Sequence, residues 1–174
     1  FFTSLNSQYK PSNTEAYSWL IADNVNLRLS PLNGKTLANL PIASKLKVMG
    51  SADAPNKDWV KVVYNNGKKK ITGYLLEKFI AEKGWFDKNT KNIFLFRTIG
   101  MEKNKWGDLR PKIQIRVAKN NKELDRAFIL GEHEDGFDID VMNGKGLDDV
   151  QNIITVNFSQ ECCACPTGMH YLVW

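Results

Sequence analysis

Residues 59–80 read WVKVVYNNGKKKITGYLLEKFI, and this stretch carries the strongest hairpin pattern in the chain. Trp59 and the valines after it have the composition of a β-strand, and the apolar residues from Ile71 onward indicate a second, returning strand. Between them, the residues NNG at 65–67 adopt turn conformations at low cost. The stretch therefore predicts an antiparallel hairpin with a basic tip, formed by the lysines at 68–70.

A second informative segment is NVNLRLSP at residues 24–31, where apolar and polar residues alternate before a turn. The alternation predicts a strand with Leu27 and Leu29 on one face and Arg28 on the other. The planar guanidinium of Arg28 could hold loop carbonyls or bind a carboxylate of a ligand. A role in clamping the adjacent loop is the favoured interpretation.

Five short motifs between residues 18 and 80 occur in an order and spacing that resemble the bacterial SH3 domain family. They are Asn26-Leu27-Arg28 with Ser30-Pro31, the leucines at 37 and 40, Leu46-Lys47-Val48, Trp59-Val60-Lys61-Val62 and Gly73-Tyr74-Leu75. Two turns depart from the family pattern: Ser30-Pro31 stands where glycine is common, and Ile42-Ala43-Ser44 replaces a Lys-Gly turn. The resemblance implies a small barrel over residues 17–81 that recognises a peptide, peptidoglycan or a protein partner, often in the cell envelope.

Three residues of this module are candidates for ligand binding. Arg28 is one of them, although its favoured interpretation is to clamp the adjacent loop. Trp59 and Tyr74 are the others, because amphipathic aromatic side chains serve exposed binding sites well. Trp59 opens a strand, which favours a core position over a groove. For Tyr74 the two interpretations stay open.

The second half, residues 85–174, follows a polar joint at 82–84 and resembles no family. Strands are expected at 92–99, 112–118, 126–133, 137–142, 152–159 and 169–174. Residues 126–133 and 137–142 are expected to form a hairpin, and residues 102–111 a loop or one helical turn ended by Pro111. The chain is therefore predicted to be mainly β, with an SH3-like small barrel followed by an antiparallel β-sandwich or small-barrel domain.

The cysteines of the chain, Cys162, Cys163 and Cys165, lie close together and are followed by His170. Thiolates and an imidazole are zinc ligands, which makes Cys162, Cys165 and His170 a candidate metal site. Structural zinc patterns, however, usually draw ligands from two separated loops. In an oxidising compartment, Cys162 and Cys165 form the less strained disulfide pair. A disulfide or free structural thiols are favoured over zinc, and zinc over a catalytic thiol.

A group of acidic residues surrounds His133 and continues with Asp138 and Asp140. The two aspartates alternate with apolar residues, so both carboxylates are expected on one face of a strand. Together with Glu134 or Asp135 they could hold a hard cation or act as a general acid and base. A solvated strand face explains the same residues and is favoured.

Residues 1–16 are predicted to be an extended lead-in, and two interpretations of its beginning stay open. The apolar pair at Phe1 and Phe2, followed by small polar residues, resembles the tail of a secretory signal peptide. Alternatively, the two phenylalanines pack on the domain or mark a boundary. The first interpretation, with the SH3 resemblance, leads us to expect a periplasmic or secreted protein.

The charge and the motifs restrict the classes of function. The net charge of +5 suits an acidic partner, but no aromatic residues are interleaved with the basic ones as in a nucleic-acid platform. No apolar run is long enough to cross a bilayer, and no cofactor motif occurs. We therefore expect a non-catalytic cell-envelope binding protein. The alternative is a cell-wall-directed metal- or thiol-dependent hydrolase, with its site in the second half and the barrel as targeting arm.

Overall fold

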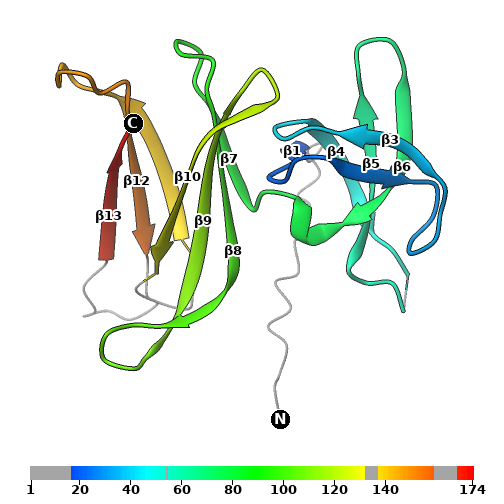
Figure 1. The fold of residues 1–174 in the computed structure, drawn as a ribbon, viewed down its shortest axis with the longest axis horizontal. Helices are drawn as coiled ribbons and strands as arrows, with labels where there is room; N and C mark the ends of the chain where they lie inside the picture. Colours follow the sequence, from blue (N-terminus) through cyan, green and yellow to red (C-terminus); the bar gives the residue numbers. More distant parts are fainter. Residues whose placement is uncertain (1–16, 54, 132–136, 159–167) are drawn as a thin grey trace.

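The computed structural model describes residues 17–53, 55–131, 137–158 and 168–174 (Figure 1). The regular structure of these residues consists of β-strands and one 3-10 turn, which confirms the mainly β fold class. The elements are β1 (Tyr17–Trp19), β2 (Val25–Arg28), β3 (Thr36–Leu40), β4 (Lys45–Ser51), β5 (Trp59–Asn65), β6 (Lys70–Leu76), η1 (Glu77–Phe79), β7 (Lys83–Phe86), β8 (Ile93–Lys103), β9 (Leu109–Lys119), β10 (Lys122–Leu130), β11 (Phe137–Asn143), β12 (Asn152–Phe158) and β13 (Gly168–Val173).

The first six strands form one antiparallel sheet in the order β1-β4-β5-β6-β2-β3. The predicted hairpin is β5 and β6, paired from Trp59 and Leu76 at one end to Asn65 and Lys70 at the tip. At the tip, the side chain of Asn66 accepts two backbone N–H groups of the turn. The sheet encloses a core of buried side chains: Leu20, Val25, Leu27, Leu40, Leu46, Val60, Val62, Leu75 and Ile80.

Leu27 and Leu29 lie in different environments, so the prediction that they share one face is wrong. β2 ends at Arg28, and its register with β3 shifts between Leu27 and Arg28. The backbone N–H of Leu29 donates to the carbonyl of Lys35 at 2.9 Å, inside a turn. Leu27 is consequently fully buried, whereas Leu29 is 60% exposed.

The other strands form a four-stranded sheet, β10-β9-β8-β7, and a three-stranded sheet, β11-β12-β13. The two sheets enclose one apolar core, which gives this part a sandwich architecture. On the four-stranded sheet the buried members are Phe94, Phe96, Ile113, Ile115 and Val117. On the three-stranded sheet they are Val141, Ile154, Val156 and Phe158.

The strands before and after residues 132–136 lie in different sheets. The hairpin predicted between residues 126–133 and 137–142 is therefore wrong, because β10 pairs with β9 and β11 pairs with β12. Alternating apolar residues determine which face of a strand is buried, and they leave its neighbouring strand undetermined. On β11 the two aspartates are exposed, as the alternation predicts, while β10 and β11 belong to opposite layers of the sandwich.

The loop predicted at residues 102–111 is mostly strand. β8 and β9 extend into it from both sides and leave only residues 104–108 as a turn. Asn104 closes this turn, because its Oδ1 accepts two backbone N–H groups at 2.9 Å each. Pro111 lies inside β9, and its carbonyl still accepts the N–H of Gly131 at 2.7 Å. Proline therefore does not end the strand at this position.

A further buried cluster joins the six-stranded sheet to the sandwich, and the two parts lie side by side (Figure 1). Its buried members are Ile21, Ile42, Ala43, Ala81, Leu95 and Ala118. The joint predicted at residues 82–84 includes the start of β7 and lies beside this cluster, against which Trp19 packs. A Cβ atom added to Gly84 would lie 2.5 Å from Cε3 of Trp19, so the aromatic ring packs directly on the backbone there. The joint is a packed interface.

Candidate binding clefts

Two clefts in the described structure share Phe79 as a lining residue. The first, which we call the Trp59 cleft, has a volume of about 360 Å³. The second, the junction cleft, lies between the six-stranded sheet and the sandwich and has a volume of about 450 Å³. The Trp59 cleft is lined by Asp23, Asn24, Val25, Asn26, Arg28, Leu32, Trp59, Leu76 and Phe79. The junction cleft is lined by Ile21, Ala22, Lys78, Phe79, Arg97, Thr98, Ile99, Gln114 and Arg116.

The Trp59 cleft brings together two of the predicted binding residues. Arg28, at the end of β2, and Trp59, at the start of β5, both line it and are both half-buried. Nη1 of Arg28 donates to the carbonyl of Gly34 at 3.1 Å, so this side chain holds the neighbouring loop. Leu32, in that loop, is 60% exposed and also lines the cleft. Arg28 thus supports one wall of the cleft that contains Trp59.

Tyr74 occupies a different place from the other two predicted residues. It is the register partner of Arg28 across β6 and β2, and its side chain is half-buried. It does not belong to the described lining of either cleft. Phe79 was not among the residues predicted from the sequence, although it lines both clefts from η1. Its position after the GYLL strand offered no signal that distinguishes it from a core residue.

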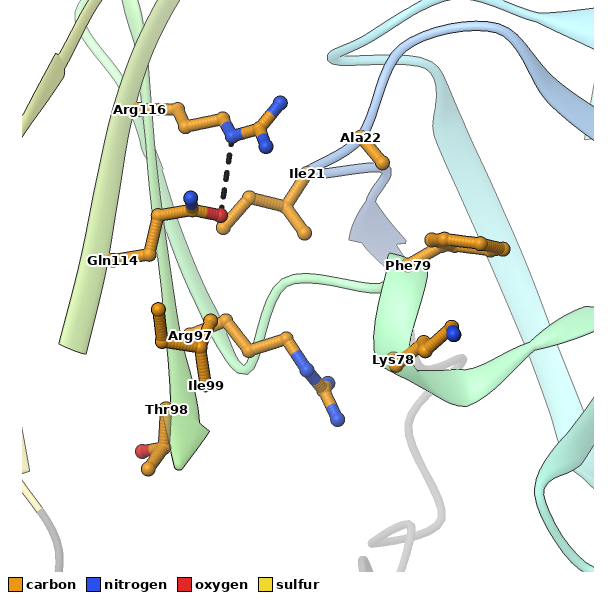
Figure 2. A pocket seen from close by; sticks show the side chains of 9 residues that line it. All are labelled: Ile21, Ala22, Lys78, Phe79, Arg97, Thr98, Ile99, Gln114 and Arg116. Carbon is orange, nitrogen blue, oxygen red and sulfur yellow. Dashed lines mark hydrogen bonds between the residues drawn. The ribbon is translucent and has the colours of Figure 1, made fainter. Parts of the chain in front are cut away.

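Two arginines dominate the junction cleft, and Figure 2 shows them extending from neighbouring strands toward the opposite wall. Arg97, on β8, donates from Nη1 to the carbonyl of Ile80 at 2.7 Å. Arg116, on β9, donates from Nε to Oε1 of Gln114 at 3.2 Å. Neither arginine was among the binding residues predicted from the sequence. The sequence did contain a signal that these arginines have a special role, because each interrupts a strand of otherwise mostly apolar residues.

Arg116 belongs to an ion-pair network at the edge of the junction cleft. Its Nη1 donates to Oε2 of Glu123 at 3.2 Å, and Arg126 donates to both oxygens of the same carboxylate. Burial lowers the pKa of Arg116, an effect that Glu123 opposes. The hydrogen bonds from Arg126 lower the pKa of Glu123. One carboxylate thus serves two guanidinium groups, which leaves an excess positive charge.

The acidic residues expected to share a strand face lie on β11. Asp138 accepts a hydrogen bond from Nζ of Lys83 at 2.6 Å, which lowers the pKa of this carboxyl. Its side chain remains 80% exposed, and Asp140 is exposed as well. Residues 133–135, the other members of the predicted group, lie outside the described residues. Among the described residues, no three His, Cys, Asp or Glu side chains gather as a metal-binding group.

The predicted cysteine cluster, Cys162, Cys163 and Cys165, lies outside the described residues, so its disulfide and zinc predictions stay predictions. His170 is described and pairs with Val156 across β13 and β12. Its ring packs edge-on against Phe158, with 5.6 Å between the ring centroids. Within the described part of the chain, Nε2 of His170 is buried and has no hydrogen-bond partner.

Comparisons with known proteins add no relative to this description. No protein-family model, no curated protein and no solved structure matches the chain significantly. Across the described ranges, no helix is long and apolar enough to cross a membrane. The function is therefore inferred from the two clefts and from the sequence motifs.

Proposed function

We propose that the chain is a non-catalytic binding protein of the cell envelope, periplasmic or secreted, whose SH3-like N-terminal module recognises an extended peptide. The peptide belongs either to a protein partner or to the glycopeptide of the cell wall. The observation that carries the proposal is the meeting of Arg28 and Trp59 in one cleft. The motif order between residues 18 and 80 supports the SH3-like assignment.

The chemistry of the Trp59 cleft suits a peptide with an apolar side chain. Trp59, Leu32 and Phe79 offer apolar surface that water still contacts, and Asn24 and Asn26 supply hydrogen-bonding groups beside it. Covering on the order of 100 Å² of apolar surface would contribute roughly 2.5 kcal/mol. Aromatic side chains in such a partly open position are frequent anchors of binding energy. Arg28 contributes by holding the loop that carries Leu32.

The test uses two probes, a displayed library of twelve-residue peptides and soluble muropeptides released from bacterial cell wall. We expect one of them to bind and to shift the indole N–H resonance of Trp59 and the Nε–H resonance of Arg28. Trp59→Ala should weaken that binding at least about tenfold, which is ~1.4 kcal/mol. Trp106→Ala is the matched control, because Trp106 is 75% exposed and lines neither cleft.

The probe that binds identifies the source of the peptide. Selection of library peptides alone indicates a protein partner, and binding of muropeptides indicates the cell wall. The proposal is overturned if neither probe shifts the Trp59 and Arg28 resonances. It is also overturned if the Trp59→Ala and Trp106→Ala variants bind the selected probe equally well.

A further inference from the structure

We propose that the junction cleft binds the carboxylate of an acidic residue in an extended peptide through the guanidinium group of Arg97, with Arg116 adding positive charge from the neighbouring strand. The apolar part of the same peptide would occupy the Trp59 cleft, and that second half rests on the proposed function. The carboxylate site is an independent assignment, because it follows from the charges of the junction cleft alone.

Consecutive residues of the chain line the two clefts. Residues 21–22 line the junction cleft and residues 23–26 line the Trp59 cleft, while Phe79 lines both. The segment of residues 21–26, which ends in β2, therefore contributes to the wall of each cleft. A peptide lying along this wall can pass over Phe79 and place neighbouring side chains in the two clefts.

Basic side chains predominate in the junction cleft. Its described lining contains Lys78, Arg97 and Arg116 and no carboxylate. Lys78 is exposed, with Nζ 5.4 Å from the centroid of the Phe79 ring, so it contributes a cation at the rim. Figure 2 shows Arg97 extending toward η1, which carries Lys78 and Phe79, while Arg116 extends toward Ala22 at the other end of the cleft.

The nearby carboxylates are already engaged by other groups. Glu82 accepts the backbone N–H and the hydroxyl of Thr98 at 3.1 and 3.0 Å. Asp23 accepts the backbone N–H of Ile42 at 3.1 Å. Glu123 is shared between Arg116 and Arg126, as described above. These three carboxylates lower the local positive charge and do not bind Arg97 in the described structure.

Arg97 has donors left for a ligand. A guanidinium carries five N–H groups in a planar fork, and Arg97 uses Nη1 for the carbonyl of Ile80. Such a fork matches a planar carboxylate better than a lysine ammonium does. Because the side chain is half-buried between two packed sheets, a charge-assisted hydrogen bond there is less weakened by water. Arg116 reinforces the positive charge from the adjacent strand.

A purely structural role is the alternative, because Arg97 also fastens β8 to the end of η1. The test therefore measures binding directly. Tetraglutamate and tetraglutamine peptides, each acetylated and amidated at its ends, are titrated into the full chain. We expect tetraglutamate to shift the Nε–H resonances of Arg97 and Arg116, and to bind more weakly at 500 mM than at 50 mM salt. Tetraglutamine should shift neither resonance.

Three variants locate the site. Arg97→Gln should weaken tetraglutamate binding at least about fivefold, and Arg97→Lys should give an intermediate loss, because it keeps the charge and loses the fork. Arg110→Gln is the matched control: Arg110 lies on β9, pairs with Asp108 at 3.3 Å and lines neither cleft. It should bind like the wild type. An ordered amide spectrum of each variant verifies that it folds.

Two results would overturn the carboxylate site: equal binding of tetraglutamine, or the same affinity for the Arg97→Gln and Arg110→Gln variants. A failure of the proposed function is distinguishable from both. In that case tetraglutamate still shifts Arg97, while no library peptide or muropeptide shifts Trp59. Conversely, library peptides that shift Trp59 while tetraglutamate leaves Arg97 unchanged would refute this site and leave the proposed function standing.

Discussion

Lys83 and Asp138 lie 55 positions apart in the sequence, and their side chains form an ion pair of 2.6 Å. The pair connects β7, at the edge of the four-stranded sheet, to β11, at the edge of the three-stranded sheet. Lys83 also lies near the ring of Phe137, 6.0 Å from its centroid. An ionic contact therefore lies where the two layers of the sandwich meet at their edges.

Asp138→Asn should have only a small effect on stability, because the Asp138 side chain is 80% exposed and water screens the pair. We expect the free energy of unfolding to fall by about 0.5 kcal/mol or less at neutral pH. Since the folded pKa of Asp138 is lowered, this contribution exists above the unfolded pKa and disappears as the pH falls. Urea unfolding at pH 7 and pH 3 measures both effects. Asp140→Asn is the control, and a loss above about 1 kcal/mol for Asp138→Asn would contradict the expectation.

Asp87 should contribute more to stability at neutral pH. The hydrogen bond from Thr90 is the largest of several that lower the pKa of Asp87 to about 2, and Asn152 adds another from β12. The contribution is present above the unfolded pKa and is lost as the pH falls from about 4 to about 2. Allowing for screening at a partly exposed site, we expect Asp87→Asn to cost on the order of 1 kcal/mol at pH 7.

Unfolding of Asp87→Asn and the wild type across pH 2 to 5 checks this expectation. The two stability curves should converge at the acidic end, since protonated Asp87 resembles the neutral variant. Asp148→Asn, in an exposed loop, should parallel the wild type throughout. A constant difference between Asp87→Asn and the wild type over the whole range would show that the charge of Asp87 is unimportant.

Leu27 and Leu29 offer a matched pair of substitutions two positions apart. Leu27→Ala should lower the free energy of unfolding by about 3 kcal/mol, because it removes a fully buried side chain from the core. Leu29→Ala should change it by less than about 0.5 kcal/mol, since Leu29 is 60% exposed. Chemical denaturation of the two variants measures the difference. Equal losses of stability would contradict the exposed position of Leu29 and would support the alternation expected from the sequence, with both leucines in the core.

Gly84→Ala should destabilise the junction between the two parts. The added methyl group would lie 2.5 Å from a ring carbon of Trp19, so the ring or the backbone of β7 must move. Overpacking of this kind typically costs about 1–3 kcal/mol. Thermal unfolding measures the loss, and Trp19→Leu in the same chain should recover part of it by removing the ring. If the double variant loses as much stability as the two single variants added together, the clash between the added methyl group and Trp19 does not cause the loss in Gly84→Ala.

The sequence by itself determined the local β structure. The valines, the NNG turn and the returning apolar residues of 59–76 required a hairpin, because period-two alternation and turn residues act between near neighbours. The alternation of residues 112–118 likewise specified the buried face of β9. The local pattern and the family resemblance also led to the prediction of Arg28 and Trp59 as binding residues.

Only the tertiary structure decided which strands became neighbours and where clefts opened. β10 and β11 follow one another in the chain and belong to opposite layers, because alternation specifies a face and leaves the partner open. Leu29 lies outside the core because the register between β2 and β3 shifts and β2 ends before this residue. The meeting of Phe79 with Arg97 and Arg116 depends on the packing of two sheets through residues far apart in sequence. Such long-range packing is set by the shape of whole buried faces, and no local pattern encodes it.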